Sequence, residues 1–236
     1  MNYIQLRKNQ LCIESLQTSK IAKKYKTPFY CYSLSQLKNN FNFFKNTFKA
    51  TRPLICFSLK SNSNITLLKE LRKMGSGADV VSVGELNRAL KAKFKPDKII
   101  FEGVGKSKED IEFAIKKNIR LINTESKNEI KLINAISKNL NKKTNIGIRL
   151  NPNINSKSIN KISTGKKTDK FGISINDLQN IINFLSNSTN IKLIGISCHI
   201  GSQIFSLEIF EKLFNVMKKV ANEFLSKNIS IKYVDL

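Results

Sequence analysis

The sequence is poor in residues that bind metals or form cross-links. It has one histidine, His199, and four cysteines at positions 12, 31, 56 and 198, which form no CxxC pair. These counts argue against a zinc site and against a disulfide framework. The N-terminus has no apolar run of signal-peptide length, and no segment approaches the roughly 18 apolar residues of a membrane span. We therefore expect a soluble protein of a reducing, cytoplasmic compartment, with neither a metal nor a membrane partner.

Acidic residues are also scarce. The 236 residues include 41 Lys and Arg but only 17 Asp and Glu, which gives a formal net charge of +24. Such an excess raises nucleic acid as a partner, because basic clusters neutralise phosphates. Here the lysines are spread along the chain without a long basic tract or an arginine-rich arm. We expect no nucleic-acid partner, although a basic binding protein built on the same scaffold stays an alternative.

What the sequence has is an alternation of two patterns. Short apolar, β-branched runs recur along the chain, and segments of helical period lie between them. The predicted strands are 54–60, 77–82, 98–103, 119–124, 145–151, 193–200 and 231–236, and the predicted helices are 64–74, 84–94, 107–118, 126–140, 175–188 and 207–228. Strands that alternate with helices require crossover connections, which place the strands parallel to one another.

Two features refine these boundaries. Ser107 with Asp110, and Ser126 with Glu129, have the [ST]xx[DE] spacing of helix N-terminal caps. A further strand, 29–32, and a helix, 33–48, are predicted before the repeating series. We assign 29–236 to the α/β domain and 1–28 to an N-terminal segment that could form part of a second lobe. The early strand and helix either belong to that lobe or cover the bottom of the barrel.

Seven such strands fit either a doubly wound open sheet or most of a (β/α)8 barrel. A dinucleotide-binding open sheet needs a GxGxxG turn after its first strand, and the sequence there is LKSNSN. Polar residues gather instead at the carboxyl ends of the runs: Lys60, Asp79, Ser82, Glu102, Asn123, Arg149, His199 and Asp235. In a parallel barrel these ends converge on one mouth, where such folds keep their active sites. The sequence therefore favours a TIM-type barrel, with about seven of its eight strands present.

Lys60 is the first candidate for chemistry. Most lysines are solvated, but a partly desolvated one at a barrel mouth can form a Schiff base with an aldehyde such as pyridoxal phosphate. His199 offers a flat face for a cofactor ring, although a lone histidine in a strand is more often a core residue. The IGSQ segment after it places a glycine and Ser202 where a phosphate could bind. Arg149 supplies a cation for an acidic group, or else a structural ion pair.

Six ordered motifs resemble those of the pyridoxal-phosphate-dependent barrel decarboxylases. They are FSLKSNSN (57–64), GSGADVVSVGELNRAL (75–90), FEGVGKSKEDI (101–111), IRLNPNINS (148–156), ISTGKKTDKFGI (162–173) and GISCHIGSQI (195–204). The resemblance runs from about residue 25 to the end of the sequence. The fifth and sixth motifs favour the diaminopimelate branch of that family over the ornithine branch.

The resemblance implies a cofactor, pyridoxal 5'-phosphate, and roles for individual residues. Lys60 would carry the cofactor and act in catalysis with His199, which would stack on its ring. Ser202 and nearby backbone would hold the phosphate, and Asp79 and Arg149 would line the site. Ser82 and the residues 163–165 are weaker assignments.

The implied reaction is the decarboxylation of meso-2,6-diaminopimelate to L-lysine and CO2, the last step of lysine biosynthesis. The small-molecule substrate is thus an amino acid, and the full-length protein is expected to be a homodimer.

The sequence departs from the family's pattern at its end. The glycine-rich phosphate loop that follows the last strand in this family, the acid for the pyridine nitrogen and the C-terminal β-domain are not found. We therefore expect an N-terminal portion of the enzyme, with weak cofactor binding or poor folding on its own. Another amino-acid decarboxylase of the same barrel family, or a pyridoxal-phosphate-binding remnant without activity, remains an alternative.

Overall fold

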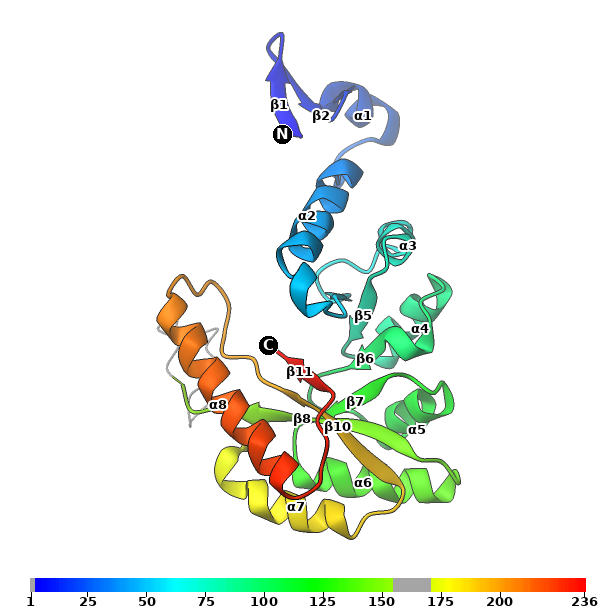
Figure 1. Cartoon of the computed structure of the whole chain (residues 1–236). Coiled ribbons are helices and arrows are strands. Elements are labelled where there is room, and N and C mark those ends of the chain that lie inside the picture. Colours follow the sequence, from blue (N-terminus) through cyan, green and yellow to red (C-terminus); the bar gives the residue numbers. More distant parts are fainter. Residues whose placement is uncertain (1–2, 155–170) are drawn as a thin grey trace.

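The computed structural model describes residues 3–154 and 171–236. Its main feature is a curled sheet of parallel strands that neighbour one another in chain order (Figure 1). The strands are β4 (Cys56–Ser58), β5 (Gly77–Val80), β6 (Ile99–Phe101), β7 (Leu121–Thr124), β8 (Thr144–Asn151), β10 (Ile191–Ser197) and β11 (Tyr233–Asp235). A short strand, β9 (Ile173–Ser174), pairs with the end of β8. Each of the seven predicted runs contains one strand of the sheet, which confirms the parallel α/β architecture.

Helices connect the strands and cover the outer face of the sheet (Figure 1). They are α3 (Ile65–Lys73), α4 (Val83–Lys91), α5 (Lys108–Lys116), α6 (Lys127–Asn139), α7 (Leu178–Ser186) and α8 (Leu207–Ser226). Short 3-10 turns lie at Lys49–Thr51, Pro96–Lys98 and Ile175–Asp177. All six predicted helices are present. Both predicted caps are confirmed as well, because Ser107 accepts from Asp110 N and Ser126 accepts from Glu129 N.

The core lies between the sheet and these helices. Alternate residues of the strands, such as Val80, Phe101 and Ile148, are buried against apolar faces of the helices, such as Ile111 and Ile130. A strand that is buried on both faces loses the simple polar alternation of an exposed sheet, and this explains the nearly continuous apolar runs in the sequence.

The curl of the sheet brings its last strand toward its first strands. Arg120, just before β7, donates from Nη1 to Tyr233 Oη on β11 at 2.6 Å, and its guanidinium lies 5.4 Å from the Tyr233 ring centroid. Arg120 and Asp235 also both act electrostatically on Cys56 of β4. No ladder joins β4 to β11 among the residues that the structure describes. The seven strands thus form a half-barrel with two edges.

A small N-terminal unit precedes the sheet. It consists of the antiparallel strands β1 (Ile4–Arg7), β2 (Gln10–Ile13) and β3 (Leu16–Gln17) and the helix α1 (Thr18–Tyr25), and it stands at the end of the molecule far from α6 and α7 (Figure 1). The next helix, α2 (Leu34–Thr47), leads to the sheet and contacts α3 through the Lys38–Glu70 ion pair at 3.2 Å. The domain boundary at residues 28 and 29 stays a prediction.

The strand predicted at 29–32 is wrong. These residues have no strand geometry, and Phe29, Tyr30 and Tyr32 are exposed. The aromatic composition favours a strand, but no sheet edge lies beside the segment to pair with it, and tertiary context decides such cases. Within the described residues, no helix combines the length and the hydropathy needed to cross a membrane.

Candidate active site

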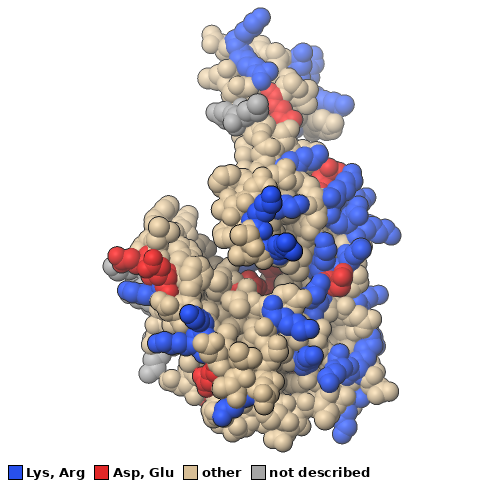
Figure 2. Space-filling view, in the orientation of Figure 1, with Lys and Arg blue, Asp and Glu red and all other residues tan. Residues whose placement is uncertain are grey.

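Polar residues from separate strands meet at the mouth of the half-barrel. Strand pairing sets Ser58 beside Asp79, and it sets Ser197 beside both Arg149 and Asp235. Because the members of each set occupy paired positions on parallel strands, they lie side by side on the same face of the sheet. Figure 2 shows a hollow near the middle of the molecule, close to the end of β11, with acidic side chains at its floor.

Lys60 lies in the tight turn after β4. Leu59 N donates to Asp79 O at 3.0 Å, and Ser61 donates to Ser58 O from N at 3.2 Å and from Oγ at 2.7 Å. The strand therefore ends at Ser58, two residues before the predicted end. The Lys60 side chain is exposed, and it forms no hydrogen bond or ion pair with the residues that the structure describes. Asn64 then caps α3 by accepting from Thr66 N at 2.9 Å.

Asp79 is a charged residue of the mouth on which Lys60 acts electrostatically. Burial raises the pKa of the Asp79 carboxyl, and the Ser58 hydroxyl and the charges of Lys60 and Arg149 oppose that rise. Ser58 Oγ and Asp79 Oδ1 are nevertheless buried without a hydrogen-bond partner, so Ser58 lies close to the carboxyl but outside hydrogen-bond geometry. A buried polar atom without a partner is costly. These two atoms therefore have hydrogen-bonding capacity that a polar ligand at the mouth can use.

Two further carboxyls, Glu102 and Asp235, share the floor of the mouth. Burial and the negative charge of Asp235 raise the pKa of Glu102 to about 8, and Asn123 Nδ2 donates to Glu102 Oε1. Asp235 keeps exposed surface on the edge strand β11, yet desolvation and then the charge of Asp79 raise its pKa as well. Carboxylates that face one another in low dielectric cannot all ionise at once. The folded state thus holds a proton here that an unfolded chain would release.

Arg149 forms a buried ion pair. Its Nη1 donates to Glu125 Oε1 at 2.8 Å, and the exposed fractions of the two side chains are 14% and 7%. The guanidinium also lies 5.0 Å from the Phe171 ring centroid, and Glu125 Oε2 accepts from Gly172 N at 3.0 Å. The structural ion pair that the sequence left open is therefore present. The charge of Arg149 still acts on both Asp79 and His199, so Arg149 also belongs to the mouth.

His199 follows the end of β10 at the rim of the mouth. Although the residue is exposed, desolvation by surrounding atoms lowers the pKa of its imidazole, and the charges of Arg149 and Lys60 lower it further. A neutral ring at neutral pH follows from these causes. Beyond it, Gly201 has a φ of 133°, which strains a residue with a side chain, and Ser202 is exposed in the turn.

Two weaker assignments have different outcomes. Ser82 is the N-cap of α4, where its Oγ accepts from Glu85 N at 3.2 Å, so the structure gives it a helix-capping role. Residues 163–165 lie outside the described residues.

Sequence reasoning missed a buried lysine behind the mouth. Lys106 has a side chain that is 1% exposed, and its Nζ lies 2.8 Å from Glu129 Oε1. The available signal was its place between two assigned features, because it follows Gly103 and Gly105 at the end of the β6 run and precedes the cap Ser107.

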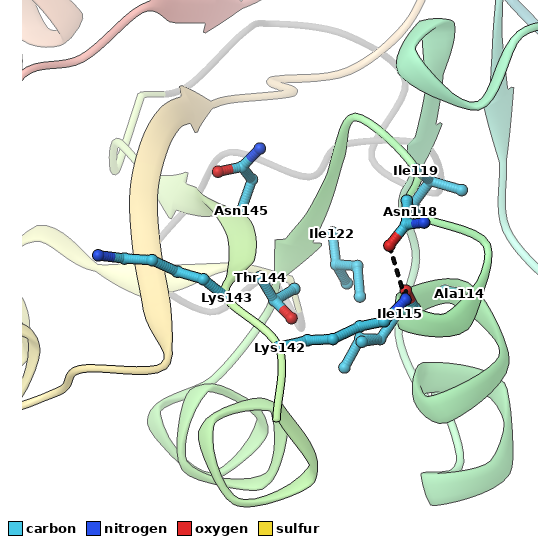
Figure 3. A pocket seen from close by; sticks show the side chains of 9 residues that line it. All are labelled: Ala114, Ile115, Asn118, Ile119, Ile122, Lys142, Lys143, Thr144 and Asn145. Carbon is cyan, nitrogen blue, oxygen red and sulfur yellow. Dashed lines mark hydrogen bonds between the residues drawn. The ribbon is translucent and has the colours of Figure 1, made fainter. Parts of the chain in front are cut away.

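Two hollows among the described residues lie elsewhere. One, of about 130 Å³, is lined by the end of α5 and the start of β8 at the opposite end of the strands, and Figure 3 shows Lys142 and Asn118 across it. The other, of about 190 Å³, lies between α7, β10 and the segment 228–230. Neither contains a residue of the mouth. Within the described residues, no cluster of three His, Cys, Asp or Glu side chains could hold a metal.

Comparison with known proteins places this mouth in a family. Residues 34–236 match the family model described as "Pyridoxal-dependent decarboxylase, pyridoxal binding domain". The chain belongs to this family. The matched range contains the whole curled sheet and its connecting helices, so the pyridoxal-dependent decarboxylase fold and its cofactor, pyridoxal phosphate, apply to the body of the protein.

Individual relatives agree with this membership. The chain is 41% identical to a diaminopimelate decarboxylase of Helicobacter pylori over 212 residues, which are 90% of this chain and 52% of that protein. It is 38% identical to that of Haemophilus influenzae over 236 residues, which are 100% of this chain and 57% of that protein. The chain thus spans about half the length of the curated relatives it matches.

Solved structures give the same result. The structure of diaminopimelate decarboxylase from M. jannaschii in co-complex with L-lysine superposes with a TM-score of 0.91 at 32% identity, over 99% of this chain and 56% of that one. A lysine decarboxylase of Selenomonas ruminantium, at 20% identity and a TM-score of 0.83, shares the fold alone. The half-barrel is therefore the counterpart of part of a TIM-type barrel, as the sequence predicted.

The residues at the mouth fit pyridoxal phosphate. Lys60 provides an amine that forms no hydrogen bond or ion pair with a described residue, and an aldehyde cofactor needs such an amine to form a Schiff base. Ser58 Oγ, Asp79 Oδ1 and Ser197 Oγ are buried polar atoms without partners around it. The donors and acceptors left unused at the mouth therefore suit a polar, aldehyde-bearing cofactor.

Proposed function

We propose that this chain supplies the cofactor-binding mouth of a diaminopimelate decarboxylase, which converts meso-2,6-diaminopimelate to L-lysine and CO2. The single observation that carries this proposal is Lys60, an exposed amine at the barrel mouth of a chain that is 41% identical to a diaminopimelate decarboxylase. L-lysine, the proposed product, is the compound named in the M. jannaschii complex. That agreement supports the diaminopimelate branch over other decarboxylases of the family.

We propose a role for each residue at the mouth. Lys60 would hold the cofactor covalently through Nζ, and His199 would present the flat face of a neutral imidazole to its ring. Ser202 and the backbone beside Gly201 would donate to its phosphate, because a turn with a glycine lets the backbone approach an anion. Arg149 and Asp79 would set the charge around Lys60 from opposite sides.

When bound, pyridoxal phosphate supplies an electron sink for the bond that breaks between the substrate's α-carbon and its carboxylate. The protein's part is to orient and to transfer protons. Lys60 Nζ would be the group that returns a proton to the carbon that has lost CO2. Arg149, fixed by Glu125, offers a cation beside Lys60 that favours an anionic substrate at the mouth. A dimer of the full-length protein stays a prediction.

The test is attachment of the cofactor. The purified chain is mixed with pyridoxal phosphate, reduced with borohydride and digested, and the modified peptide is identified by mass. We expect modification at Lys60 and its loss in Lys60→Met, whereas Lys69→Met, a change at another exposed lysine, leaves it in place. Modification spread over many surface lysines, equal in Lys60→Met, would contradict the proposed site.

Product analysis separates the activities. The chain with bound cofactor is incubated in turn with meso-diaminopimelate, L-lysine, L-ornithine and L-arginine, and the amine products are measured. We expect L-lysine from the first substrate, at a rate far below that of a full-length relative because the chain spans about half the length of its relatives, and no product from the others. Specific attachment at Lys60 without any product would support the alternative of a cofactor-binding protein without activity.

A further inference from the structure

Lys106 is a buried cation whose three N–H groups all have acceptors. Its Nζ donates to Gly103 O, to Asn123 O at 2.8 Å and to Glu129 Oε1 at 2.8 Å, and it lies 5.7 Å from the Phe101 ring centroid. An ammonium has three donors, so none is left over. Burying a lysine is costly unless it is paired and fully hydrogen-bonded. The site around Lys106 is thus built to hold a charge at one place.

The acceptors come from three different elements behind the mouth. Gly103 belongs to the loop after β6, Asn123 is the third residue of β7, and Glu129 lies in the first turn of α6. Gly103 has a φ of 93°, so the loop takes a conformation that favours glycine at the place where Lys106 holds it. One side chain therefore fixes the relative positions of two strand ends and one helix.

A first set of contacts links Lys106 to Glu102, one of the carboxyls at the floor of the mouth. Glu102 immediately precedes Gly103, and its Oε1 accepts from Asn123 Nδ2. Lys106 therefore binds the backbone of one partner, Asn123, and the backbone of Gly103, the residue next to the other partner. The positive charge of Lys106 also opposes the rise in the pKa of Glu102, against Asp235 and Asp79, which raise it. Lys106 therefore contributes a positive charge beside a carboxyl on which Asp235 and Asp79 act with negative charges.

A second set of contacts links Lys106 to Arg149 at the mouth. Glu129 Oε2 accepts from Glu125 N at 2.9 Å, and Glu125 in turn accepts from Arg149 Nη1 at 2.8 Å. Lys106, Glu129, Glu125 and Arg149 form a continuous series of charged and hydrogen-bonded groups from behind the sheet to the mouth.

We propose that Lys106 is a positioning residue for the cofactor site, which acts through Asn123 on Glu102 and through Glu129 and Glu125 on Arg149. This inference rests on the proposed function, because the mouth must bind pyridoxal phosphate for the positions of Glu102 and Arg149 to matter. Lys106 itself touches neither the cofactor nor the substrate. Its effect is on how well the preformed mouth receives the cofactor.

The test compares cofactor affinity in variants that break the arrangement at two points. Lys106→Met removes the charge and all three donors at nearly constant volume, and Glu129→Gln removes the ion pair while keeping an acceptor. We expect the dissociation constant for pyridoxal phosphate, from the absorbance of the bound form, to rise about tenfold in each. The double variant should bind no more weakly than Lys106→Met alone, because Lys106→Met already breaks the contact with Glu129.

Lys142 provides a matched control. It also holds backbone carbonyls at the end of a helix, since its Nζ lies 2.7 Å from Asn118 Oδ1 and 3.2 Å from Ile115 O, but it is at the opposite end of the strands (Figure 3). Lys142→Met should lower the melting temperature and leave the dissociation constant within about twofold of the unchanged chain. Circular dichroism at the titration temperature checks that each variant is folded.

Three results would overturn the proposal. One is an unchanged affinity in Glu129→Gln, the milder variant, which decides the matter if Lys106→Met does not fold. Another is an equal loss of affinity in Lys142→Met, which would make the effect one of general stability. The third is a fully additive double variant. Failure of the unchanged chain to bind the cofactor at all would instead refute the proposed function.

Discussion

Replacing Gly147 of β8 with alanine should disrupt the floor of the mouth. Gly147 of β8 pairs with Asn123 of β7. A methyl group at Gly147 would overlap Asn123 Oδ1 and would lie 2.9 Å from its Cγ and 3.1 Å from Leu121 Cδ1. Asn123 is 2% exposed, so it has little room to move aside. The methyl therefore forces Asn123 away from Glu102 and leaves both polar groups buried without each other.

The size of the effect follows from two costs. Overpacking a close-packed interior costs about 1–3 kcal/mol, and stranding buried polar groups costs about 1–3 kcal/mol more. We expect Gly147→Ala to lower the free energy of unfolding by about 4 kcal/mol, a large part of the roughly 5–15 kcal/mol that a domain has. Urea denaturation followed by far-ultraviolet circular dichroism measures the loss.

A control and a rescue variant make this reasoning refutable. Gly84 lies in α4, where an added methyl meets only Ser82 Oγ at 3.6 Å, so Gly84→Ala should raise stability by up to about 1 kcal/mol. Asn123→Ala should restore part of the stability lost in Gly147→Ala, because it removes the atom that the methyl meets. A loss of unfolding free energy below about 1 kcal/mol in Gly147→Ala would refute the account. So would a double variant, Gly147→Ala with Asn123→Ala, that is no more stable than Gly147→Ala alone.

Two further predictions concern the charges. Glu125→Ala should cost about 3–5 kcal/mol of unfolding free energy, because it leaves Arg149 buried and unpaired, whereas Glu125→Gln should cost less since it keeps an acceptor; equal losses in urea denaturation would contradict this. The pKa of Glu102 is raised in the folded state from 4.5 to about 8, so the folded state binds the proton more tightly and the unfolding free energy should fall as pH rises between these values. Urea midpoints across that range should show a flatter profile for Glu102→Gln than for the original chain, and superimposable profiles would contradict the prediction.

The repeating part of the fold could be predicted because its signals are local. Each strand is a short apolar run, and the helices α3 to α6 begin at residues whose side chains cap them, so boundaries at Ser107 and Ser126 follow from the sequence alone. The N-terminal sheet gave no such signal. Its apolar residues, among them Leu6 at 73% and Leu16 at 61% exposed, are not buried in a core, so their pattern does not indicate which face is inward.

The candidate site, like the fold, has one part that the sequence predicts and another that it does not. Lys60, Asp79, Arg149 and His199 lie at or near the carboxyl ends of four different strands, and barrel geometry brings such ends together; the structure places all four within electrostatic range of at least one other. Their roles toward the cofactor, and that of Ser202, stay predictions. Lys106 was out of reach, because its acceptors at Asn123 and Glu129 are 17 and 23 residues away in the chain. Which partners a buried lysine finds depends on tertiary packing.

The distribution of acidic residues explains why the large positive charge misleads as a functional signal. A surface lysine keeps its hydration, so additional lysines on exposed helices cost little and contribute little. A carboxylate inside the half-barrel has no such freedom, because its loss leaves a buried cation or donor unpaired. Of the 17 acidic residues, five lie at or behind the mouth: Asp79, Glu102, Glu125, Glu129 and Asp235. These five carboxylates therefore indicate the position of the mouth more clearly than the net charge of +24 does.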